Sequence, residues 1–219
     1  MLNPIMHYII ICEGGSENAY IQELNKYFKE QEINIIFRPS PVNTGHFKEV
    51  IKKYKCERKK NKKNKFYIFV DYDIYKKNTN KNNDNYTKKS KGIPDFLFNY
   101  FNFEDFLILH LNKNSILEYQ KKCDDKNHFN IPMKSEIYMP LIKKFFNDYK
   151  KGSLPADFKI SEESLKKLFF NNQDADIKFE SDFARFLQEI ILQDSKRKCL
   201  TSSKNTTSST KSLEKDSQK

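Results

Sequence analysis

Two short apolar runs end on acidic side chains, and this pattern organises the first half of the chain. The run 9–12 is followed by Glu13 and two glycines, and the run 66–70 is followed by Asp71-Tyr72-Asp73. Continuous apolar, β-branched runs of this length are typical of buried strands, and glycine pairs mark turns. Because the carboxyl ends of parallel strands meet at one edge of a sheet, we expect Glu13, Asp71 and Asp73 to converge there.

Apolar residues between the two runs recur at helical spacing. A helix is expected after Gly14-Gly15, with Ser16 as its cap, and a second helix from Phe47. Residues 33–37 predict a second strand, followed by a loop over 39–45. The order strand, helix, strand, helix, strand predicts an α/β fold with a mostly parallel, helix-covered sheet and right-handed crossovers. The apolar positions that predict the first helix are Tyr20, Ile21, Leu24, Tyr27 and Phe28. Those that predict the second are Phe47, Val50, Ile51 and Tyr54.

The second half of the chain is mainly helical in pattern beyond residue 92. The length of 219 residues suits one domain of ordinary size. We expect a single domain over 1–195, with a sheet core over about 5–112 and a helical part over about 113–195. Residues 196–219 are rich in Ser, Thr and Lys without an apolar pattern, which predicts a disordered tail.

The chain is strongly basic, with a formal net charge of +11 and a pI near 9.3. Such a charge favours polyanionic partners, above all nucleic acid. The segment 52–65 carries nine Lys or Arg residues against one acid, and the segment 76–91 carries six Lys against one. Each run can also be a solvated surface. Because the second run follows Asp73, it is expected to lie over the acidic edge and hold a phosphate backbone, through Lys76, Lys77, Lys88 and Lys89.

The strand-end carboxylates are candidate ligands of a divalent cation. Hard oxygen ligands suit Mg²⁺ or Mn²⁺, which activates water and neutralises charge on a phosphoryl group. The predicted ligands are Glu13, Asp71 and Asp73, although Asp71 can also cap a helix and Asp73 can be a loop residue. Glu17 opens a helix and is either a further metal-facing carboxylate or a favourable first-turn charge. The glycine pair lacks the lysine of a P-loop and the spacing of a dinucleotide-binding loop.

An apolar segment over 102–110 carries Glu104 and His110. Buried polar groups need partners. In one interpretation the segment holds a helix cap and a hydrogen-bonded histidine. In the other, Glu104 faces the acidic cluster while His110 orients a neighbour or a substrate phosphate.

Several other classes of protein are disfavoured. The cysteines, Cys12, Cys56, Cys123 and Cys199, lie far apart and form no zinc-finger or disulfide pattern. No apolar stretch is long enough to cross a bilayer. An acidic residue occurs too early for a signal peptide, so a soluble, cytoplasmic protein is expected.

Four motifs together resemble the RloB-like proteins, Toprim relatives encoded beside restriction-modification loci. The segment 12–20, CEGGSENAY, is similar to their cEGxxTExxYF opening, and 70–73, VDYD, to their fDxD motif. The segment 103–110, FEDFLILH, resembles NPxFExWLLLHF, and 149–152, YKKG, resembles YxKG. The motifs follow the family's order over residues 7–158. Ser16 stands in place of Thr, Phe106 in place of Trp, and the Asn-Pro pair is absent.

The resemblance implies a Toprim-like fold and a Mg²⁺-dependent nuclease acting on DNA or RNA in bacterial defence against phage or mobile elements. Other defence-locus proteins are possible partners. Lys151 would contact phosphate if the helical part folds back over the site. One alternative is a non-catalytic nucleic-acid-binding or complex-forming protein, and another is an acidic pocket that accepts a phosphoryl group. The predicted catalytic residues are Glu13, Glu17, Asp71, Asp73, Glu104 and His110.

Overall fold

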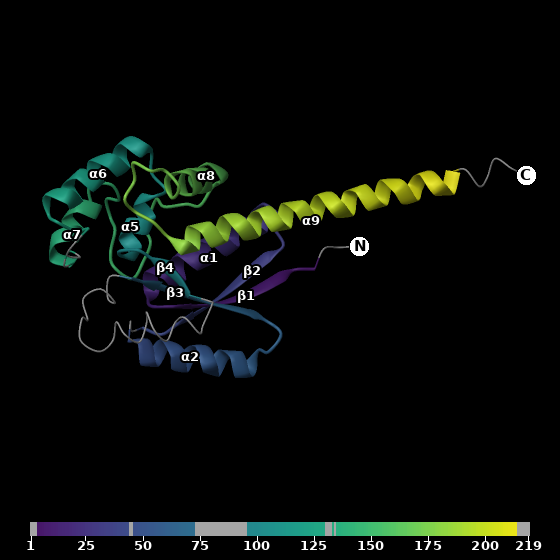
Figure 1. Ribbon diagram of the computed structural model, residues 1–219, viewed down its shortest axis with the longest axis horizontal. Coiled ribbons are helices and arrows are strands. Elements are labelled where there is room, and N and C mark those ends of the chain that lie inside the picture. Colours follow the sequence, from purple (N-terminus) through teal and green to yellow (C-terminus); the bar gives the residue numbers. More distant parts are fainter. Residues whose placement is uncertain (1–3, 44–45, 73–95, 130–132, 134, 214–219) are drawn as a thin grey trace, which may run out of the picture.

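The computed structural model describes residues 4–43, 46–72, 96–129, 133 and 135–213. Within these residues, four strands form one all-parallel sheet in the order β2-β1-β3-β4. The strands are β1 (Met6–Cys12), β2 (Ile35–Pro41), β3 (Lys65–Asp71) and β4 (Phe96–Asn99). Helices α1 (Gly15–Glu30) and α2 (Phe47–Lys60) connect the first three strands (Figure 1). The predicted α/β architecture with a parallel, helix-covered sheet is confirmed.

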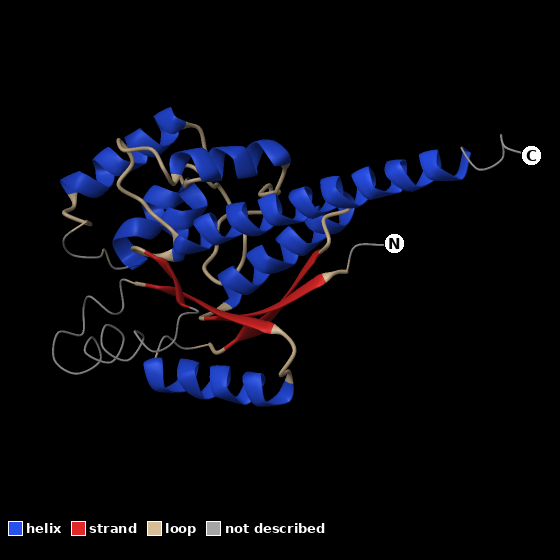
Figure 2. Cartoon of the chain, turned by 45° about the vertical axis from the view of Figure 1, so that its right-hand side comes forward, coloured by secondary structure: helices blue, strands red, loops and turns tan. Residues whose placement is uncertain are grey.

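Both faces of the sheet are buried, as expected for parallel strands with helical crossovers. Alternate residues of β1 point to opposite faces: Tyr8 and Ile10 pack in the large core with α1, whereas Ile9 and Ile11 pack in a smaller cluster with α2. Helix α2 covers its face of the sheet, and α1 and the helical part cover the other (Figure 2). The two-residue period of a strand explains this division.

Two strands differ from the sequence-based expectation. The second strand begins at Ile35 and continues through Pro39 to Pro41, where a loop was expected. Its position at the edge of the sheet explains why prolines are tolerated, because one side of its backbone needs no ladder partner. Strand β4 was not predicted. It has only four residues, which are too few to show a strand pattern.

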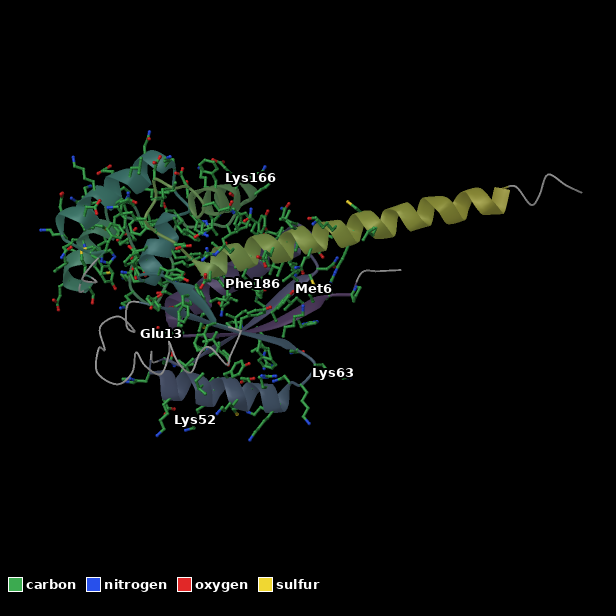
Figure 3. All side chains as sticks on the ribbon, viewed as in Figure 1. Met6, Glu13, Lys52, Lys63, Lys166 and Phe186 are labelled. Atoms are coloured by element: carbon green, nitrogen blue, oxygen red, sulfur yellow. The ribbon has the colours of Figure 1, made fainter. Side chains whose placement is uncertain are left out.

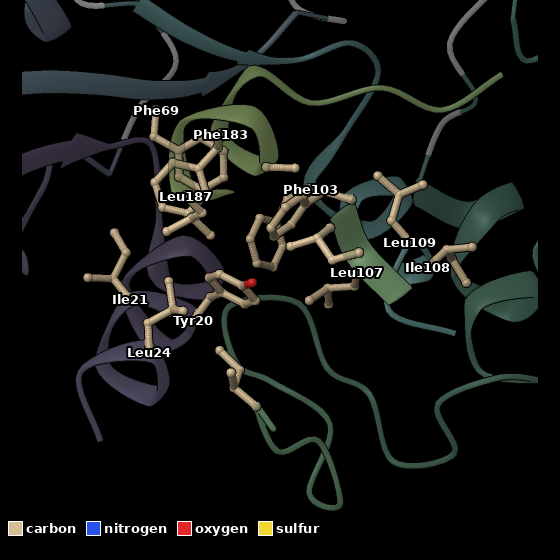
Figure 4. Packing of buried hydrophobic residues seen from close by; sticks show 14 of the residues in the cluster. Tyr20, Ile21, Leu24, Phe69, Phe103, Leu107, Ile108, Leu109, Phe183 and Leu187 are labelled. Atoms are coloured by element: carbon tan, nitrogen blue, oxygen red, sulfur yellow. The ribbon is translucent and has the colours of Figure 1, made fainter. Parts of the chain in front are cut away.

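The helical part packs on the α1 face and shares its core. It comprises α5 (Phe103–Ile108), α6 (Lys113–Asp125), α7 (Ser135–Ile142), α8 (Glu162–Asn171) and α9 (Asp182–Leu213). Phe183 of α9 stacks on Phe69 of β3 with ring centroids 4.1 Å apart. Tyr20 of α1 meets Phe103 of α5 edge to face, and these rings surround one interior (Figure 4). The sheet and the helical part therefore form a continuous core.

Helix α9 continues where the sequence predicted a disordered tail from residue 196. It extends to Leu213 and projects beyond the rest of the chain (Figure 1). Lys198 pairs with Asp194 at 3.2 Å and donates to the Glu32 carbonyl at 2.6 Å, which anchors the helix past residue 196. Beyond this anchor the helix continues to Leu213 without the apolar stripe that the prediction required. No described helix is both long and apolar enough to cross a membrane.

Candidate functional site

The strand order creates a crevice at the carboxyl ends of β1 and β3. From the central strand β1 the chain passes to β2 on one side, and it then returns to β3 on the other side. At such a topological switch point the loops leave in opposite directions, and ligands of α/β proteins bind there. Glu13 directly follows β1 and Asp71 is the last residue of β3. The two predicted strand-end carboxylates thus lie at the switch point.

A cavity of about 640 Å³ opens at this edge. It brings together four of the predicted site carboxylates. Lys151 is also in its wall, so the helical part does fold back over the strand ends. Glu13 lies at the end of the sheet nearest the start of α2 (Figure 3). The charged residues that line the cavity are Glu13, Glu17, Asp71, Glu104, Glu136 and Lys151.

Two residues in the described part of the chain donate hydrogen bonds to Asp71. Its Oδ2 accepts from the backbone N–H of Phe103 at 3.1 Å, and its Oδ1 accepts from Nδ2 of Asn99 at 3.2 Å. Asn99 is itself fixed because the Ser181 hydroxyl donates to its Oδ1 at 2.7 Å. Asn99 and Ser181 are fully buried. The carboxylate therefore has a defined orientation, set by β4, by the start of α5 and by the segment before α9.

Glu104 enters the cavity from the first turn of α5. This short helix begins at Asn102, whose side chain forms a capping box with Asp105. Glu104 is only 3% exposed, and its Oε1 accepts a 2.7 Å hydrogen bond from the hydroxyl of Tyr149. Burial raises the pKa of Glu104, while the Tyr149 hydrogen bond and the charge of Lys151 oppose the rise. Asn102 and Asp105 make the helix cap, and Glu104 lines the cavity, as the second interpretation of this segment expected.

Glu17 lies in the first turn of α1 and is also buried. Burial, and to a smaller extent the negative charge of Glu104, raise its pKa to about 7. Hydrogen bonds from the backbone at Glu17 and Gly14 and the charge of Lys151 act in the opposite direction. The two buried carboxyl groups therefore interact, and a positive charge placed between them would relieve the repulsion.

The segment 149–153 closes over the start of α1. The N–H of Gly152 donates to the Ser16 hydroxyl at 2.9 Å. A Cβ on Gly15 would lie 2.7 Å from the Gly152 carbonyl oxygen, so this close approach requires glycine at position 15. Gly152 has φ +92°, which also favours glycine. The contact positions Lys151 beside the carboxylates.

Lys151 remains protonated in this position. Partial burial lowers its pKa, but Tyr138, Glu104 and Asp71 outweigh that effect and raise it overall. Its Nζ donates to the Tyr138 hydroxyl at 3.3 Å. The cavity thus combines several carboxylates with one fixed ammonium group, an arrangement that can bind a cation and an anion side by side.

His110 does not line the cavity. It is buried against Phe106 and Phe158, and its Nε2 shares a 3.0 Å hydrogen bond with the Tyr20 hydroxyl. Burial lowers its pKa to about 3, so the ring is neutral at ordinary pH. The interpretation of a core histidine describes this position, but among the described residues only Nε2 has a hydrogen-bond partner, and the buried Nδ1 has none.

The remaining predicted site residues lie outside the part of the chain that the structure describes. They are Asp73, Lys76, Lys77, Lys88 and Lys89.

Sequence reasoning missed the residues that orient the carboxylates. Asn99, Tyr138 and Ser181 carry no motif of their own, and Tyr149, which belongs to the YKKG segment, was given no role of its own. Their roles depend on contacts between residues 13 to 82 positions apart, from Tyr138 with Lys151 to Asn99 with Ser181. Such contacts leave no local spacing that a sequence pattern could reveal.

Sequence reasoning also missed a second, buried polar cluster, which consists of Asp105 of α5, Cys123 of α6 and His128. Its ligand atoms lie within 4.8 Å of one another, close enough to hold a metal ion. His128 Nδ1 accepts from the backbone N–H of Met133 at 3.0 Å, so Nε2 carries the proton and donates to Asp105 Oδ2 at 2.9 Å. Tyr119 donates to Asp105 Oδ1 at 2.8 Å. These hydrogen bonds already satisfy Asp105 and both nitrogens of His128.

Comparisons with protein-family models, with curated proteins and with solved structures found no match to this chain. The resemblance to RloB-like proteins therefore stays a prediction that rests on the four motifs.

Proposed function

We propose that the chain is a metal-dependent phosphodiesterase that hydrolyses DNA or RNA, with Mg²⁺ or Mn²⁺ as its cofactor. The observation that carries the proposal is the joint placement of Glu13, Glu17, Asp71 and Glu104 around one cavity with Lys151. The Toprim-like identity of the fold and a role in defence against phage or mobile elements belong to the same proposal and rest on the motif resemblance.

The donor set fits a hard divalent cation. The four predicted residues that line the cavity are all carboxylates, and Mg²⁺ and Mn²⁺ prefer oxygen ligands over nitrogen and sulfur. Burial raises the pKa of Glu17 and of Glu104, and a dication would offset the cost of keeping both ionised. Glu13 and Asp71 are the proposed principal ligands, with Asp73 as a further ligand. When bound, the ion polarises the phosphoryl group and lowers the pKa of a bound water.

The other residues have separable roles in this proposal. Lys151, held by Tyr138 at 3.3 Å, contacts a non-bridging phosphate oxygen and neutralises charge that develops there. Glu17 is the candidate base that receives a proton from the attacking water. Asn99 and the N–H of Phe103 keep both oxygens of Asp71 in place. Tyr149 does the same for Glu104.

The test is cleavage by purified protein of single- and double-stranded DNA, tRNA and other RNA, with Mg²⁺, with Mn²⁺ and with EDTA. Asp71→Asn and Glu13→Gln are expected to abolish cleavage. Glu118→Gln, an exposed substitution on α6 outside the cavity, is the matched control and should cleave as the wild type does.

Asp71→Asn places an amide where Asp71 accepts two hydrogen bonds, so its folding must be checked by circular dichroism and thermal unfolding. Calorimetric titration with each metal gives a second readout, in which Glu13→Gln should weaken binding at least about tenfold, or ~1.4 kcal/mol. Metal-dependent cleavage that survives both substitutions would refute the site. Salt-sensitive nucleic-acid binding without cleavage or metal binding would instead support a non-catalytic binding protein.

A further inference from the structure

Helix α2 has one buried face and one fully exposed face. Val50 and Tyr54 are buried against Ile9, Ile11 and Ile68 of the sheet. The opposite side of the helix points away from the protein, as Lys52 shows (Figure 3). Because the apolar side is already packed on the sheet, α2 has no second apolar face to insert into a membrane or another core.

Four lysines form a straight row on the exposed face. They recur at intervals of four, three and four residues, which keeps them on one side of a helix. All four are exposed. Eleven residues at ~1.5 Å per residue give the row a length of roughly 16 Å. We call this row the α2 lysine stripe; it consists of Lys48, Lys52, Lys55 and Lys59.

Little negative charge offsets the stripe. The acids of α2 are Glu49 and Glu57. Glu57 points to the other side, where it binds Arg38 at 2.6 Å. Glu49 lies 3.8 Å from Lys52, but this pair is exposed and weak. Within the described residues, no ion pair involves the other three lysines of the stripe.

The stripe connects two features of the surface. Helix α2 begins four residues after Asn43, which lines the acidic cavity. At its other end, Arg58, Lys62 and Lys65 line a basic depression of about 430 Å³ at the amino ends of the strands. Lys63 marks this end, and Glu13 lies toward the opposite end of the helix (Figure 3). Positive charge thus runs along α2, from a helix start that follows a cavity residue closely in sequence to the amino ends of the strands.

We propose that the α2 lysine stripe binds the phosphate backbone of a nucleic acid whose scissile bond occupies the acidic cavity. Phosphates of one B-DNA strand rise ~3.4 Å each along the axis while the strand winds around it, so a straight row of this length can contact a short stretch of backbone. Lysine contacts to phosphates carry affinity without sequence preference. This inference rests on the proposed function for the position of the scissile bond, but its binding test does not depend on cleavage.

The stripe variant replaces all four stripe lysines by glutamine. A matched control removes the same charge from exposed lysines of the helical part, Lys121, Lys126, Lys144 and Lys159. Binding of a labelled single strand and of a labelled duplex is measured in EDTA over a series of salt concentrations. For the duplex, the stripe variant should lose at least about tenfold in affinity. The slope of log K against log salt concentration should become less negative by about three to four. The control should keep the wild-type slope.

Equal losses in both variants, a wild-type slope in the stripe variant, or no binding by the wild type would each overturn the inference. A parallel assay with phosphatidylserine vesicles tests a different anionic surface. Vesicle binding that is lost in the stripe variant while nucleic-acid binding is kept would also overturn it.

The outcomes for binding and cleavage are separable. Stripe-dependent binding without metal-dependent cleavage would uphold the stripe and refute the phosphodiesterase. Cleavage by the stripe variant with a wild-type KM would refute the stripe and uphold the phosphodiesterase. Unchanged thermal unfolding of both variants would show that the substitutions leave the fold intact.

Discussion

Tyr149 donates a hydrogen bond to Glu104 at 2.7 Å, and its oxygen lies 3.4 Å from the Ser16 hydroxyl. Tyr149 is fully buried and comes from the segment that follows α7. One side chain therefore joins the start of α1, the start of α5 and the lysine-bearing segment. The carboxylates of the cavity depend on a residue that neither strand end supplies.

Replacing Tyr149 by phenylalanine should weaken the fold. The change removes the donor that opposes the rise in the pKa of Glu104, so that pKa should increase further. Loss of a hydrogen bond to a buried carboxylate costs about 1 to 3 kcal/mol in the free energy of unfolding. Urea unfolding near neutral pH measures this cost. Tyr27→Phe, on the far end of α1, is the control, and equal stability of the two variants would contradict the assigned role.

Gly15→Ala should separate the segment 149–153 from α1. The new methyl group would lie 2.7 Å from the Gly152 carbonyl oxygen, and the backbone must move to relieve the contact. We expect a loss of about 1 to 3 kcal/mol in the free energy of unfolding. Lys151 should also be displaced, and cleavage should fall with it.

Gly14→Ala is the matched control for that substitution. Its methyl group would meet only the Glu17 side chain, at an ordinary 3.5 Å, and Gly14 has an extended backbone that alanine adopts readily. Thermal unfolding should therefore distinguish the two neighbouring variants. If both alanines are equally well tolerated, the close approach of Gly15 to Gly152 is refuted.

The stability of the metal-free protein should respond to the charge of Glu17. Its pKa is about 7 in the folded state against 4.5 in the unfolded chain. Between these values the folded state keeps a proton that the unfolded state has lost, so this contribution to stability falls as pH rises from 4.5 to 7. The full change is roughly 3 kcal/mol. In Glu17→Gln this loss is absent.

The lowered pKa of His110 changes stability with pH in the opposite direction to Glu17, over part of the same pH range. Its pKa falls from 6.5 to about 3 on folding, so its contribution is present above pH 6.5 and is lost as pH falls toward 3. The comparison of Glu17→Gln with the wild type cancels this common effect. Urea unfolding in EDTA should show the variant gaining stability relative to the wild type as pH rises from 4.5 to 7. A difference independent of pH would rule out the raised pKa of Glu17.

The sequence predicted the features that local patterns encode. Apolar runs that end at Glu13 and Asp71 place both carboxylates at one sheet edge, because parallel strands share a direction. The switch of the chain from one side of β1 to the other was not predictable, since crossover rules leave several strand orders open. The strand order nevertheless decides that these two carboxylates are neighbours.

The sequence does not show which of two side chains, Glu104 or His110, reaches the cavity. They lie six residues apart on a segment in which residues 102–110 are all buried. With every position buried, no polar face indicates which side chain reaches the cavity. The structure places Glu104 in the cavity wall and His110 against Tyr20. The packing of α1 and α9 around this segment determines which side chain reaches the cavity. These are tertiary contacts, which a local sequence pattern does not encode.

Because α9 packs on β1, one face of this strand stays uncovered while the ribosome synthesises most of the chain. Phe186 packs edge to face on Tyr8, with ring centroids 5.7 Å apart. At ~5 to 20 residues per second, the 178 residues between them take roughly 9 to 36 s to synthesise. During that interval one face of β1 lacks its final cover. Nascent chains stalled before α9 should therefore be substrates for chaperones and proteases, because the first described strand is covered only when the last described helix has been made.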